Sequence, residues 1–565
     1  MNALFFEKNI PFEMRYYFYC ILLFSNFSIA QPVTIGLLYQ DVSNQPGTIL
    51  FAPNANNTTY LINKCGYYLH SWTSAYKPGV SSYLLEDGLL LRPGNTNNAT
   101  FSGGGGAGGI IEKIDWSGSV VWSYLISDST MCQHHDIHAL PNGNVLALVW
   151  EKKTKADAIL AGRDTNFIGA TFWNEKIVEL QPVGTNGANI VWEWNSWDHL
   201  IQDFDSTKSN FGVISQNPNL ININANFSGS LNPDWLHFNS IDYNASLDQI
   251  LISSRLTSEI YIVDHSTTTL EASTHLGGSS GKGGDFIYRW GNPMVYNRGL
   301  LSDQKFFGQH SAHWIGQGLV GEGDIMVFNN GKDRPAGNYS TVEIIKPPLD
   351  SFGNYSITST LPFLPINSYW IYQDPIPTNL YSDRISGAQR IANGHTLICS
   401  GNKGEFIEID SLNTVVWEYK NPVNGLGPRP QGTSIFNNGV FRTNFYNYDY
   451  SGFIGQTLTP GLPIELSPVV YSCLVTSNSD VSEDKNVPIV FPNPFENEFQ
   501  ISMKNQGSFM SSYSVFDVTG KLIKSGEIDT IFKNINIAGI TSGIYILRVV
   551  SSENTYFFKI IKQDH

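Results

Sequence analysis

The stretch DWLHFNSIDYNASLDQILISSR, residues 234–255, has the pattern of a strand, a tight turn and a second strand. Apolar and polar residues alternate from Ile241, the segment ASLD at 245–248 forms the tip, and the apolar run 250–252 follows. Antiparallel pairing of the two strands would bring Asn239 and Arg255 to the same edge of the sheet. With His237 beside them, we expect three polar groups to converge on one rim.

The same pattern repeats along the body of the chain, from residue 31 to about 475. Other copies are SYLLEDGLLLR (82–92), HDIHALPNGNVLALVW (135–150), HSAHWIGQGLVGEGDIMVFNNG (310–331) and SGAQRIANGHTLICSG (386–401). Each is followed by a second strand pair rich in aromatic residues, so one unit has four antiparallel strands in roughly 40 residues. Segments 47–72 and 432–468 could share one mixed unit. The sequence therefore predicts an all-β fold, a six-bladed β-propeller, with seven blades as the alternative.

Superposing the copies gives two columns of polar residues at one end of the strands. The first column, at the head of the innermost strands, holds His135, Asn239, His310 and Ser386. The second column, after the second strands, holds Arg255, Asn329 and Ser400. Innermost strands line the channel of a propeller, so these side chains are expected to gather at the channel mouth.

Composition limits the classes of function. The 565 residues are 41% hydrophobic and 13% aromatic, which supports globular folding in several units. The net charge of −15 argues against a nucleic-acid partner and leaves no polybasic membrane surface. An anionic substrate would need to be held by local cations.

Residues 1–30 have the pattern of an export signal peptide. Arg15 precedes the apolar run 16–24, and small residues at 28–30 suit a cleavage site before Gln31. The run is shorter than a membrane span needs, so cleavage is favoured over an anchor.

Four cysteines follow the signal: Cys65, Cys132, Cys399 and Cys473. Their wide spacing excludes a zinc ribbon or a CxxC redox pair. Export permits a disulfide, but three pairings or buried free thiols are all compatible with the sequence.

The composition and residue pattern of the chain change after residue 475. Residues 476–486 are polar and acidic, as in a linker, and 487–565 contain short strands typical of a small β-sandwich. The motifs PNP (492–494), TGK (519–521) and SGIY (542–545) resemble the C-terminal sorting domains of type IX secretion. The resemblance implies that the type IX machinery exports the protein through the periplasm to a secreted or cell-surface location.

The body resembles the aryl-sulfate sulfotransferase family of six-bladed propellers. The resemblance is densest at QHHDIHALPNGN (133–144), DWLHFNSIDYN (234–244), ISSR (252–255) and FGQHSAHW (307–314). Family members transfer a sulfuryl group from a phenolic sulfate ester to a phenol without a nucleotide donor. The resemblance implies that His310 is the transiently sulfurylated nucleophile, with no cofactor and no metal. It further implies catalytic roles for His237, Asn239, Arg255 and His135, with His134 as the alternative to His135.

The chemistry of these side chains agrees with that assignment. A neutral imidazole can attack sulfur, and an arginine and an amide can hold the sulfuryl oxygens in a loose anionic transition state. Read singly, however, His237 could simply bond Asp234, and Arg255 could pair with Glu259. His138 and His313 are interpreted as structural.

Further residues are weaker candidates. Asn329, His134 and Lys282 could contact substrate, with Lys282 in a glycine-rich loop (276–286) expected over the channel mouth. The glycine-rich segment 102–109 lacks the features of a phosphate loop and is interpreted as a flexible connection. Two other functions stay open: a non-catalytic surface propeller that binds a sulfated or anionic ligand, and a metal-dependent hydrolase or lyase. The sequence identifies neither the donor and acceptor phenols nor an oligomeric state.

Overall fold

The computed structural model describes residues 33–225, 231–351, 353–469, 488–491, 495–503, 511–530, 532–550 and 555–563. The predicted signal peptide (1–30) and linker (476–486) lie outside these residues. The chain divides into two compact units, Met1–Leu474 and Val475–His565. Strands dominate both units, which confirms the predicted all-β class.

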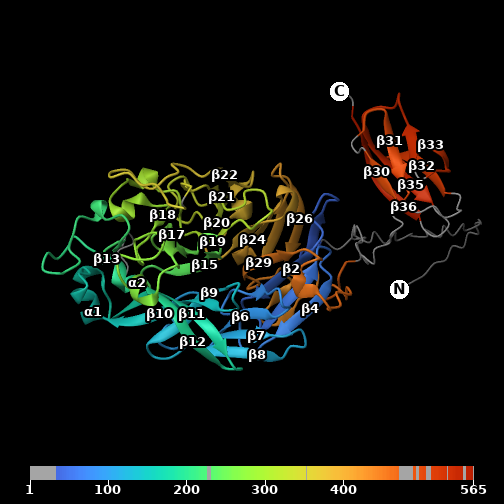
Figure 1. Ribbon diagram of the computed structural model, residues 1–565. Helices are drawn as coiled ribbons and strands as arrows, with labels where there is room; N and C mark the ends of the chain where they lie inside the picture. The colour runs from blue at the N-terminus through green and yellow to red at the C-terminus, as the bar shows by residue number, and fades with distance from the viewer. Residues whose placement is uncertain are drawn as a thin grey trace, which may run out of the picture. The chain divides into compact units, whose positions relative to one another are not determined.

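Four sheets of the body are each formed by four consecutive antiparallel strands (Figure 1). The first is β5 (Tyr83–Leu84), β6 (Leu90–Asn95), β7 (Gly109–Ile114) and β8 (Val120–Leu125). The second is β9 (Met131–Ala139), β10 (Val145–Thr154), β11 (Thr171–Val183) and β12 (Gly187–Asn195). The third is β15 (Phe238–Asn244), β16 (Gln249–Ser254), β17 (Glu259–Asp264) and β18 (Tyr288–Trp290). The fourth is β19 (His310–Trp314), β20 (Ile325–Asn329), β21 (Thr341–Ile345) and β22 (Trp370–Tyr372).

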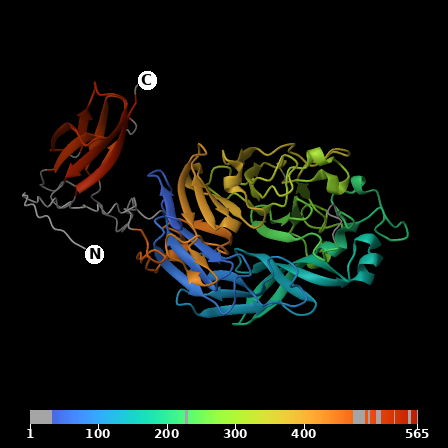
Figure 2. The same cartoon turned by 180° about the vertical axis from the view of Figure 1, so that it is seen from behind.

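Segments near the two ends of the body complete two further sheets. In one, β1 (Gly36–Gln40) pairs with β26 (Val415–Lys420), beyond β25 (Glu405–Ile409), β24 (Thr396–Ser400) and β23 (Gly387–Arg390). In the other, β29 (Val440–Tyr446) pairs with β2 (Thr48–Pro53), followed by β3 (Thr58–Asn63) and β4 (Tyr68–Thr73). The pairing of Thr48 with Tyr446 joins the two ends in one mixed sheet, as the repeat pattern predicts. Figure 2 shows these blue and orange strands side by side.

Turn chemistry explains why the strands alternate so regularly. The Asn142–Gly143 pair between β9 and β10 places Gly143 at φ +87°, which a residue with a Cβ rarely adopts. The Asp87–Gly88 pair between β5 and β6 does the same, with Gly88 at φ +83°. These local turns fix the hairpins that the sequence pattern indicates.

Each sheet packs against the next through a shared hydrophobic core. Six clusters in the described body contain residues of two neighbouring sheets. Representative pairs are Leu91 with Ala147, Leu146 with Ile252, Ile260 with Val327, Phe328 with Ile398, Phe406 with Phe51, and Leu61 with Leu90. Fully burying a side chain of this size contributes about 1.5–3 kcal/mol, so the cores shared between neighbouring sheets stabilise the body.

Hydrogen bonds also join the innermost strand of each sheet, or the residues that flank it, to the next sheet. They run from Tyr83 Oη to Asp136 Oδ1, Ile241 N to Asp136 Oδ2, Trp314 N to Asp242 Oδ2, Ile385 N to His310 Nε2, Phe445 N to Gln389 Oε1, and Asn444 Nδ2 to Ser82 O. These bonds fix the positions of the inner strands relative to one another. A site built from residues of several inner strands requires such fixed positions.

The remaining elements of the body are short. The helices are α1 (Lys155–Leu160), α2 (Thr269–Ala272) and α3 (Pro377–Leu380), and the 3₁₀ turns are η1 (Thr165–Phe167), η2 (Ser196–His199), η3 (Ile214–Gln216), η4 (Pro293–Tyr296), η5 (Leu301–Asp303), η6 (Ala392–Gly394), η7 (Gly401–Lys403) and η8 (Ser451–Phe453). Two small ladders pair β13 (Leu200–Ile201) with β14 (Ile221–Asn222) and β27 (Val423–Asn424) with β28 (Gly427–Pro428). None of the helices in the described part of the chain combines the length and the apolar character needed to cross a membrane.

The cysteines differ in state. Cys65 is disulfide-bonded, whereas Cys132 and Cys399 are free and buried. Cys473 lies outside the described residues. Burial raises the pKa of the Cys132 thiol to about 11, so this group stays protonated and unreactive at neutral pH.

The C-terminal unit has two antiparallel sheets. One contains β30 (Ile489–Phe491), β31 (Glu498–Ser502) and β34 (Phe532–Asn536), and the other contains β33 (Leu522–Ile528), β32 (Ser511–Asp517), β35 (Gly543–Val550) and β36 (Thr555–Lys562). Residues of both sheets, including Phe499, Val515 and Leu547, form one core. Alternating burial along β35 explains its pattern of apolar and polar residues.

Candidate active site

Three histidines from three different sheets lie close together, each in or directly before an innermost strand. His135 lies in β9, His237 directly precedes β15, and His310 begins β19. The ring centroids of His135 and His237 are 4.5 Å apart, and the rings of His135 and His310 each lie 6.3 Å from the ring of Phe441. The structure thus brings together the three imidazoles that the sequence placed at one end of the strands.

Bulges in the inner strands aim these side chains. His135, His237 and Ser311 have φ values of +48°, +54° and +57°, a region that non-glycine residues seldom occupy. The pairing register shifts around His135, opposite Ala147 and Val149 of β10, and again between His310 and His313. Such bulges cost backbone energy and commonly re-aim side chains at functional sites.

The surroundings of His310 fix its tautomer. Its Nδ1 lies 2.7 Å from Asn330 Oδ1 and 3.1 Å from the Gly308 carbonyl oxygen, and both of these atoms can only accept. The proton of the neutral ring is therefore on Nδ1, and the lone pair is on Nε2. The Ile385 amide donates to Nε2 over 3.2 Å, a long bond that is easily given up. This tautomer is the one a nucleophilic imidazole requires.

His237 is held by a carboxylate. Asp234 Oδ2 accepts a hydrogen bond from Nδ1 over 2.6 Å, while the side chain of Asp234 is buried and that of His237 is 12% exposed. The other carboxylate oxygen, Oδ1, has no hydrogen-bond partner in the described residues. The bond suggested by the sequence therefore exists, and it leaves His237 Nε2 free of Asp234 and able to exchange a proton.

His135 is oriented through its neighbour. His134 Nδ1 and His135 Nδ1 are 2.9 Å apart, and His134 Nε2 lies 2.9 Å from Glu175 Oε2. As an acceptor, Glu175 holds a proton on His134 Nε2, so His134 Nδ1 accepts from His135 and leaves the lone pair of His135 on Nε2. Burial raises the pKa of Glu175, and His134 offsets part of that rise. His134 also stacks on Trp150, so we interpret it as a support for His135.

Arg255 lies near the three histidines as a cation without an ion-pair partner among the described residues. It follows β16, and its Cγ and Nε lie 3.9 Å from the position that a Cβ on Gly308 would take. In the described part of the chain, its guanidinium group has no hydrogen bond or ion pair. The alternative pairing with Glu259 does not occur, because Glu259 pairs with Arg289 instead. Burial lowers the pKa of Arg255, which nevertheless stays a permanent cation.

Asn239 is buried beneath this group. Its Nδ2 donates to the Gln309 carbonyl oxygen over 2.7 Å, and its Oδ1 has no partner in the described residues. Gln309 Nε2 in turn donates to Ser253 Oγ and to the Glu259 carbonyl oxygen. One amide proton of Asn239 thus positions the backbone just before His310, and the second has no acceptor among the described residues.

Two of the expected substrate-binding residues lie elsewhere. Asn329 uses its carboxamide within its own sheet, with Phe307 N at 2.9 Å and Glu343 Oε1 at 2.8 Å. The pairings of Ser254 with Glu259 and of Asn329 with Thr341 show that Asn330, not Asn329, is equivalent to Arg255. The sequence alignment of the repeats was one residue out of register, and a shift of one residue turns a side chain to the other face.

Lys282 is also outside the group. It is exposed in the loop 276–286, which packs over His199, Glu271 and Thr274 beside the outer strands. The placement of this loop over the channel mouth was therefore wrong, because its glycines pack closely against α2, the residues after it and His199.

The sequence did not identify several neighbours of the three histidines. The glycine-rich segment 102–109 packs against two of them: a Cβ on Gly106 would lie 2.3 Å from His135 Nε2, and one on Gly105 would lie 3.7 Å from His237 Cε1. Only a glycine at 106, at φ +78°, allows this approach. The segment is thus packed against the site and is not a free connection. Asp234, close to His237 in sequence, was the one partner with a sequence signal.

Burial keeps two of the histidines neutral. It is the main cause that lowers the pKa of His135 and His310 well below the ordinary value of 6.5. Neighbouring imidazoles add to the effect at His135, and the charge of Arg255 adds to it at His310. A neutral His310 with its lone pair on Nε2 is therefore maintained below neutral pH.

These shifts predict how stability depends on pH. The unfolded chain protonates both histidines near pH 6.5, whereas the folded protein does so only at the lowered pKa values. Stability should therefore fall as the pH drops from about 7 through 6.5 and below, with a slope of up to about 1.4 kcal/mol per pH unit for each group. Urea denaturation at pH 7.5 and 5.5 measures this, and the His135→Gln/His310→Gln double variant should lose less stability than the native protein. An equal loss in both would contradict the prediction.

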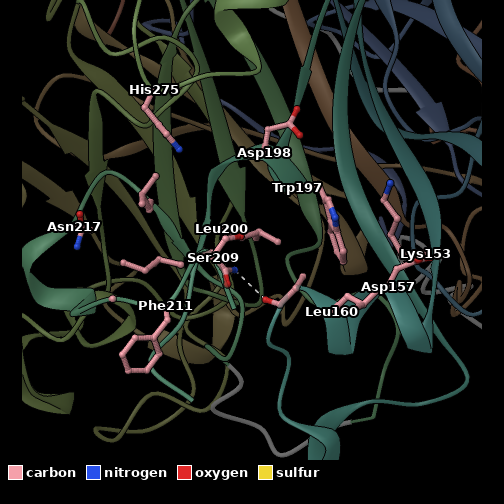
Figure 3. Close-up of a pocket in the computed structure, with 15 residues that line it drawn as sticks. Lys153, Asp157, Leu160, Trp197, Asp198, Leu200, Ser209, Phe211, Asn217 and His275 are labelled. Carbon is pink, nitrogen blue, oxygen red and sulfur yellow. Dashed lines mark hydrogen bonds between the residues drawn. The ribbon is translucent and has the colours of Figure 1, made fainter. Parts of the chain in front are cut away.

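Among the described residues, one group could hold a metal ion, and it does not include the three clustered histidines. It consists of His199, His275 and Asp285. A cavity of about 850 Å³ is lined by His275 together with residues such as Trp197, Asp198 and Phe211 (Figure 3). The candidate active site is not part of this cavity.

Comparisons with known proteins identify the family. The family model described as arylsulfotransferase (ASST) matches residues 94–426, more than half of the chain. The chain therefore belongs to the arylsulfotransferase family, as its motifs predicted. The model described as secretion system C-terminal sorting domain matches residues 489–563, and this type IX sorting domain directs the protein to the cell surface or to secretion.

Other comparisons add little. No curated protein matches the chain. Similar solved structures include a streptogramin B lyase, with 12% identity, 70% of this chain and 85% of that chain covered, and a TM-score of 0.32. The virginiamycin B lyase from Staphylococcus aureus has 10% identity, coverages of 70% and 90%, and a TM-score of 0.30. The periplasmic gluconolactonase of Pseudomonas aeruginosa has 10% identity, coverages of 66% and 94%, and a TM-score of 0.31. Scores this low support no argument about activity.

Proposed function

We propose that the protein is an exported aryl sulfotransferase that moves a sulfuryl group from a phenolic sulfate ester to a phenol. The proposed intermediate is a sulfohistidine at His310, and no nucleotide donor takes part. The observation that carries the proposal is Arg255, a half-buried guanidinium beside three imidazoles that is unpaired among the described residues. A guanidinium with no ion-pair partner in direct contact is suited to binding two oxygens of a sulfuryl group.

The finer architecture that we infer is a closed six-bladed β-propeller, in which the β29–β2–β3–β4 sheet completes the ring. Two observations support closure: cores shared between each pair of neighbouring sheets, and hydrogen bonds that link the inner strands in cyclic order. In this architecture the three histidines stand at one mouth of the central channel. A phenolic ester would reach them from that mouth.

In the first half of the reaction, His310 Nε2 attacks the sulfur of the donor. The N–S bond forms while the bond between sulfur and the phenolic oxygen breaks, and the electron pair leaves on that oxygen. His237, as an imidazolium stabilised by Asp234, gives its Nε2 proton to the departing phenolate. Arg255 and the free amide proton of Asn239 stabilise the charge on the sulfuryl oxygens.

The second half reverses these bonds with another phenol. His237, now neutral, accepts the proton of the acceptor hydroxyl, whose oxygen attacks sulfur as the N–S bond breaks. The electron pair returns to His310 Nε2, and the site regains its starting protonation state. Because the sulfuryl group stays on His310 after the first phenol leaves, the acceptor can bind after the donor product has gone, which gives ping-pong kinetics.

An assay with the purified exported chain tests the proposal. Incubation with 4-nitrophenyl sulfate and a second phenol should release nitrophenolate and form the new aryl sulfate. Donor alone should give one rapid equivalent of nitrophenolate and a peptide containing His310 that carries the added sulfuryl mass. Binding of the ester without any turnover would instead favour a non-catalytic propeller, and turnover abolished by chelators would favour a metal-dependent enzyme.

The role given to His237 makes a prediction about Asp234. Asp234→Asn keeps the size of the side chain but removes the charge that stabilises the His237 imidazolium. We expect kcat to fall by about 10²-fold, with a smaller loss for donors whose phenolate needs no protonation. Comparing 4-nitrophenyl sulfate with phenyl sulfate measures this difference.

A matched control is available in β15, the strand that follows His237. Asp242 forms the same kind of contact with His138, at 3.1 Å, away from the three histidines. Asp242→Asn should change kcat by no more than a few-fold and should not alter the dependence on the leaving group. Equal effects of the two substitutions would show that Asp234 acts only on structure.

A further inference from the structure

A second histidine cluster lies outside the candidate active site. His199 ends η2, and His275 and Asp285 flank the glycine-rich loop that follows α2. His199 Nδ1 is 2.8 Å and His275 Nδ1 is 2.7 Å from the same oxygen, Asp285 Oδ1. One potential ligand atom from each residue lies within 4.8 Å of the other two.

The hydrogen bonding of His199 leaves a lone pair aimed at this carboxylate. His199 Nε2 is 2.9 Å from the carbonyl oxygen of Ala272, which can only accept, so Nε2 carries a proton. In the neutral ring, the lone pair is then on Nδ1, facing Asp285 Oδ1. Two lone pairs 2.8 Å apart repel, so either His199 Nδ1 donates a second proton to Asp285 or both atoms bind a shared cation that replaces this proton. Histidines that bind metals have this arrangement, with the second nitrogen donating to a carbonyl or a carboxylate.

The residues around His199 are closely packed. Its ring stacks on Trp194 with an interplanar angle of 4°, and Trp194 Nε1 donates to the Gly284 carbonyl oxygen over 2.7 Å. A Cβ on Gly284 would lie 2.6 Å from His199 Nε2 and 2.0 Å from the Ala272 oxygen. The loop therefore approaches His199 as closely as a glycine permits, which orients the imidazole and places Asp285 against it.

One side of the cluster is open. The side chains of His199 and Asp285 are 1% and 13% exposed, whereas that of His275 is 58% exposed. Figure 3 shows His275 at the edge of the cavity that Trp197 and Asp198 also line. An ion held by the three residues would thus be anchored from within and accessible from the cavity.

We propose that His199, His275 and Asp285 bind one divalent transition-metal ion, with zinc the ion that best suits two imidazole nitrogens and a carboxylate oxygen. Three protein ligands leave a fourth position for water or an oxygen ligand from the cavity. The ion would tie the loop after α2 to the segment that follows β12. This site is independent of the proposed sulfuryl transfer.

Zinc binding by the tag-free, full exported chain tests the proposal. After chelator treatment and dialysis, titration with Zn²⁺ should give one ion per chain, and Co²⁺ should give the visible absorption of a low-symmetry site. His275→Ala and Asp285→Asn should each weaken Zn²⁺ binding by at least about 10-fold. Zn²⁺ should raise the melting temperature of the native protein but not that of either variant.

Two controls separate this site from other histidines. His265→Gln removes an imidazole whose two nitrogens face different carboxylates, Asp248 and Glu179, and should leave Zn²⁺ binding unchanged. His310→Ala should also leave it unchanged. The proposal is overturned if the native chain binds no Zn²⁺ below 1 mM, if binding survives in His275→Ala and Asp285→Asn, or if His310→Ala abolishes it.

Discussion

Replacement of His310 by alanine is expected to abolish sulfuryl transfer, with kcat falling by at least about 10⁴-fold. His310 combines a lone pair that its hydrogen bonds fix on Nε2 with the neighbouring guanidinium of Arg255. The loss should appear in the first half-reaction, because the N–S bond cannot form. Rapid mixing with 4-nitrophenyl sulfate should then show no initial burst of nitrophenolate, and no peptide should gain the sulfuryl mass.

The control for this experiment removes a different imidazole from an inner strand. His138, in β9, hydrogen-bonds Asp242 and lies outside the three clustered histidines. His138→Ala should keep the burst and most of the turnover, and circular dichroism of both variants should match that of the native protein. A folded His310→Ala protein that still shows a full burst would remove the nucleophile assignment and with it the sulfohistidine intermediate.

Replacement of Arg255 should have the second-largest effect. Arg255→Ala removes the permanent charge beside His310, and we expect kcat/KM to fall by about 10³-fold. Arg255→Lys keeps the charge but loses the planar pair of donors, so its kcat/KM should lie between those of the native protein and Arg255→Ala. Initial rates over a range of donor concentrations, with nitrophenolate as the readout, measure both variants. Inorganic sulfate should inhibit the native protein more strongly than Arg255→Ala.

A nearby arginine provides the comparison. Besides burial, the nearby positive charge of Arg384 lowers the pKa of Arg255. The guanidinium of Arg384, however, donates to Asn402 Oδ1 over 3.1 Å. Arg384→Ala should therefore lower kcat/KM by less than about 10-fold, mainly through weaker attraction of the anionic donor. If the alanine variants at 255 and 384 lose activity equally, Arg255 serves only as part of the general positive field.

Much of the fold could be predicted because its determinants are local. Alternating strands and turns such as Asn142–Gly143 define each hairpin, and repetition of the hairpin defines the sheets. The mixed sheet followed from the incomplete units at both ends of the body. The position of Asn330 could not be predicted, because matching two adjacent asparagines between repeats needs the pairing register, and the register is set by contacts between strands.

The neighbours of the three histidines could not be predicted from the sequence either, because they come from distant segments of the chain. Glu175 reaches His134 from β11, and the glycine segment 102–109 reaches His135 from the connection between β6 and β7. Neither contact leaves a periodic or compositional signal. The loop 276–286 was misplaced because glycine indicates equally a flexible segment and one that packs closely, and only the close approach of Gly284 to His199 decides between them.

The sequence by itself indicated the strand repeat, the export domain and the family, and it supplied the candidate histidines. These properties depend on the order of residues along the chain, since periodicity, turns and motifs are all short-range. The tertiary structure alone decided which tautomer His310 adopts, that Arg255 forms no ion pair among the described residues, and that His199, His275 and Asp285 meet. Those properties depend on atoms from distant segments approaching within hydrogen-bonding distance, and that approach is decided by how the sheets pack.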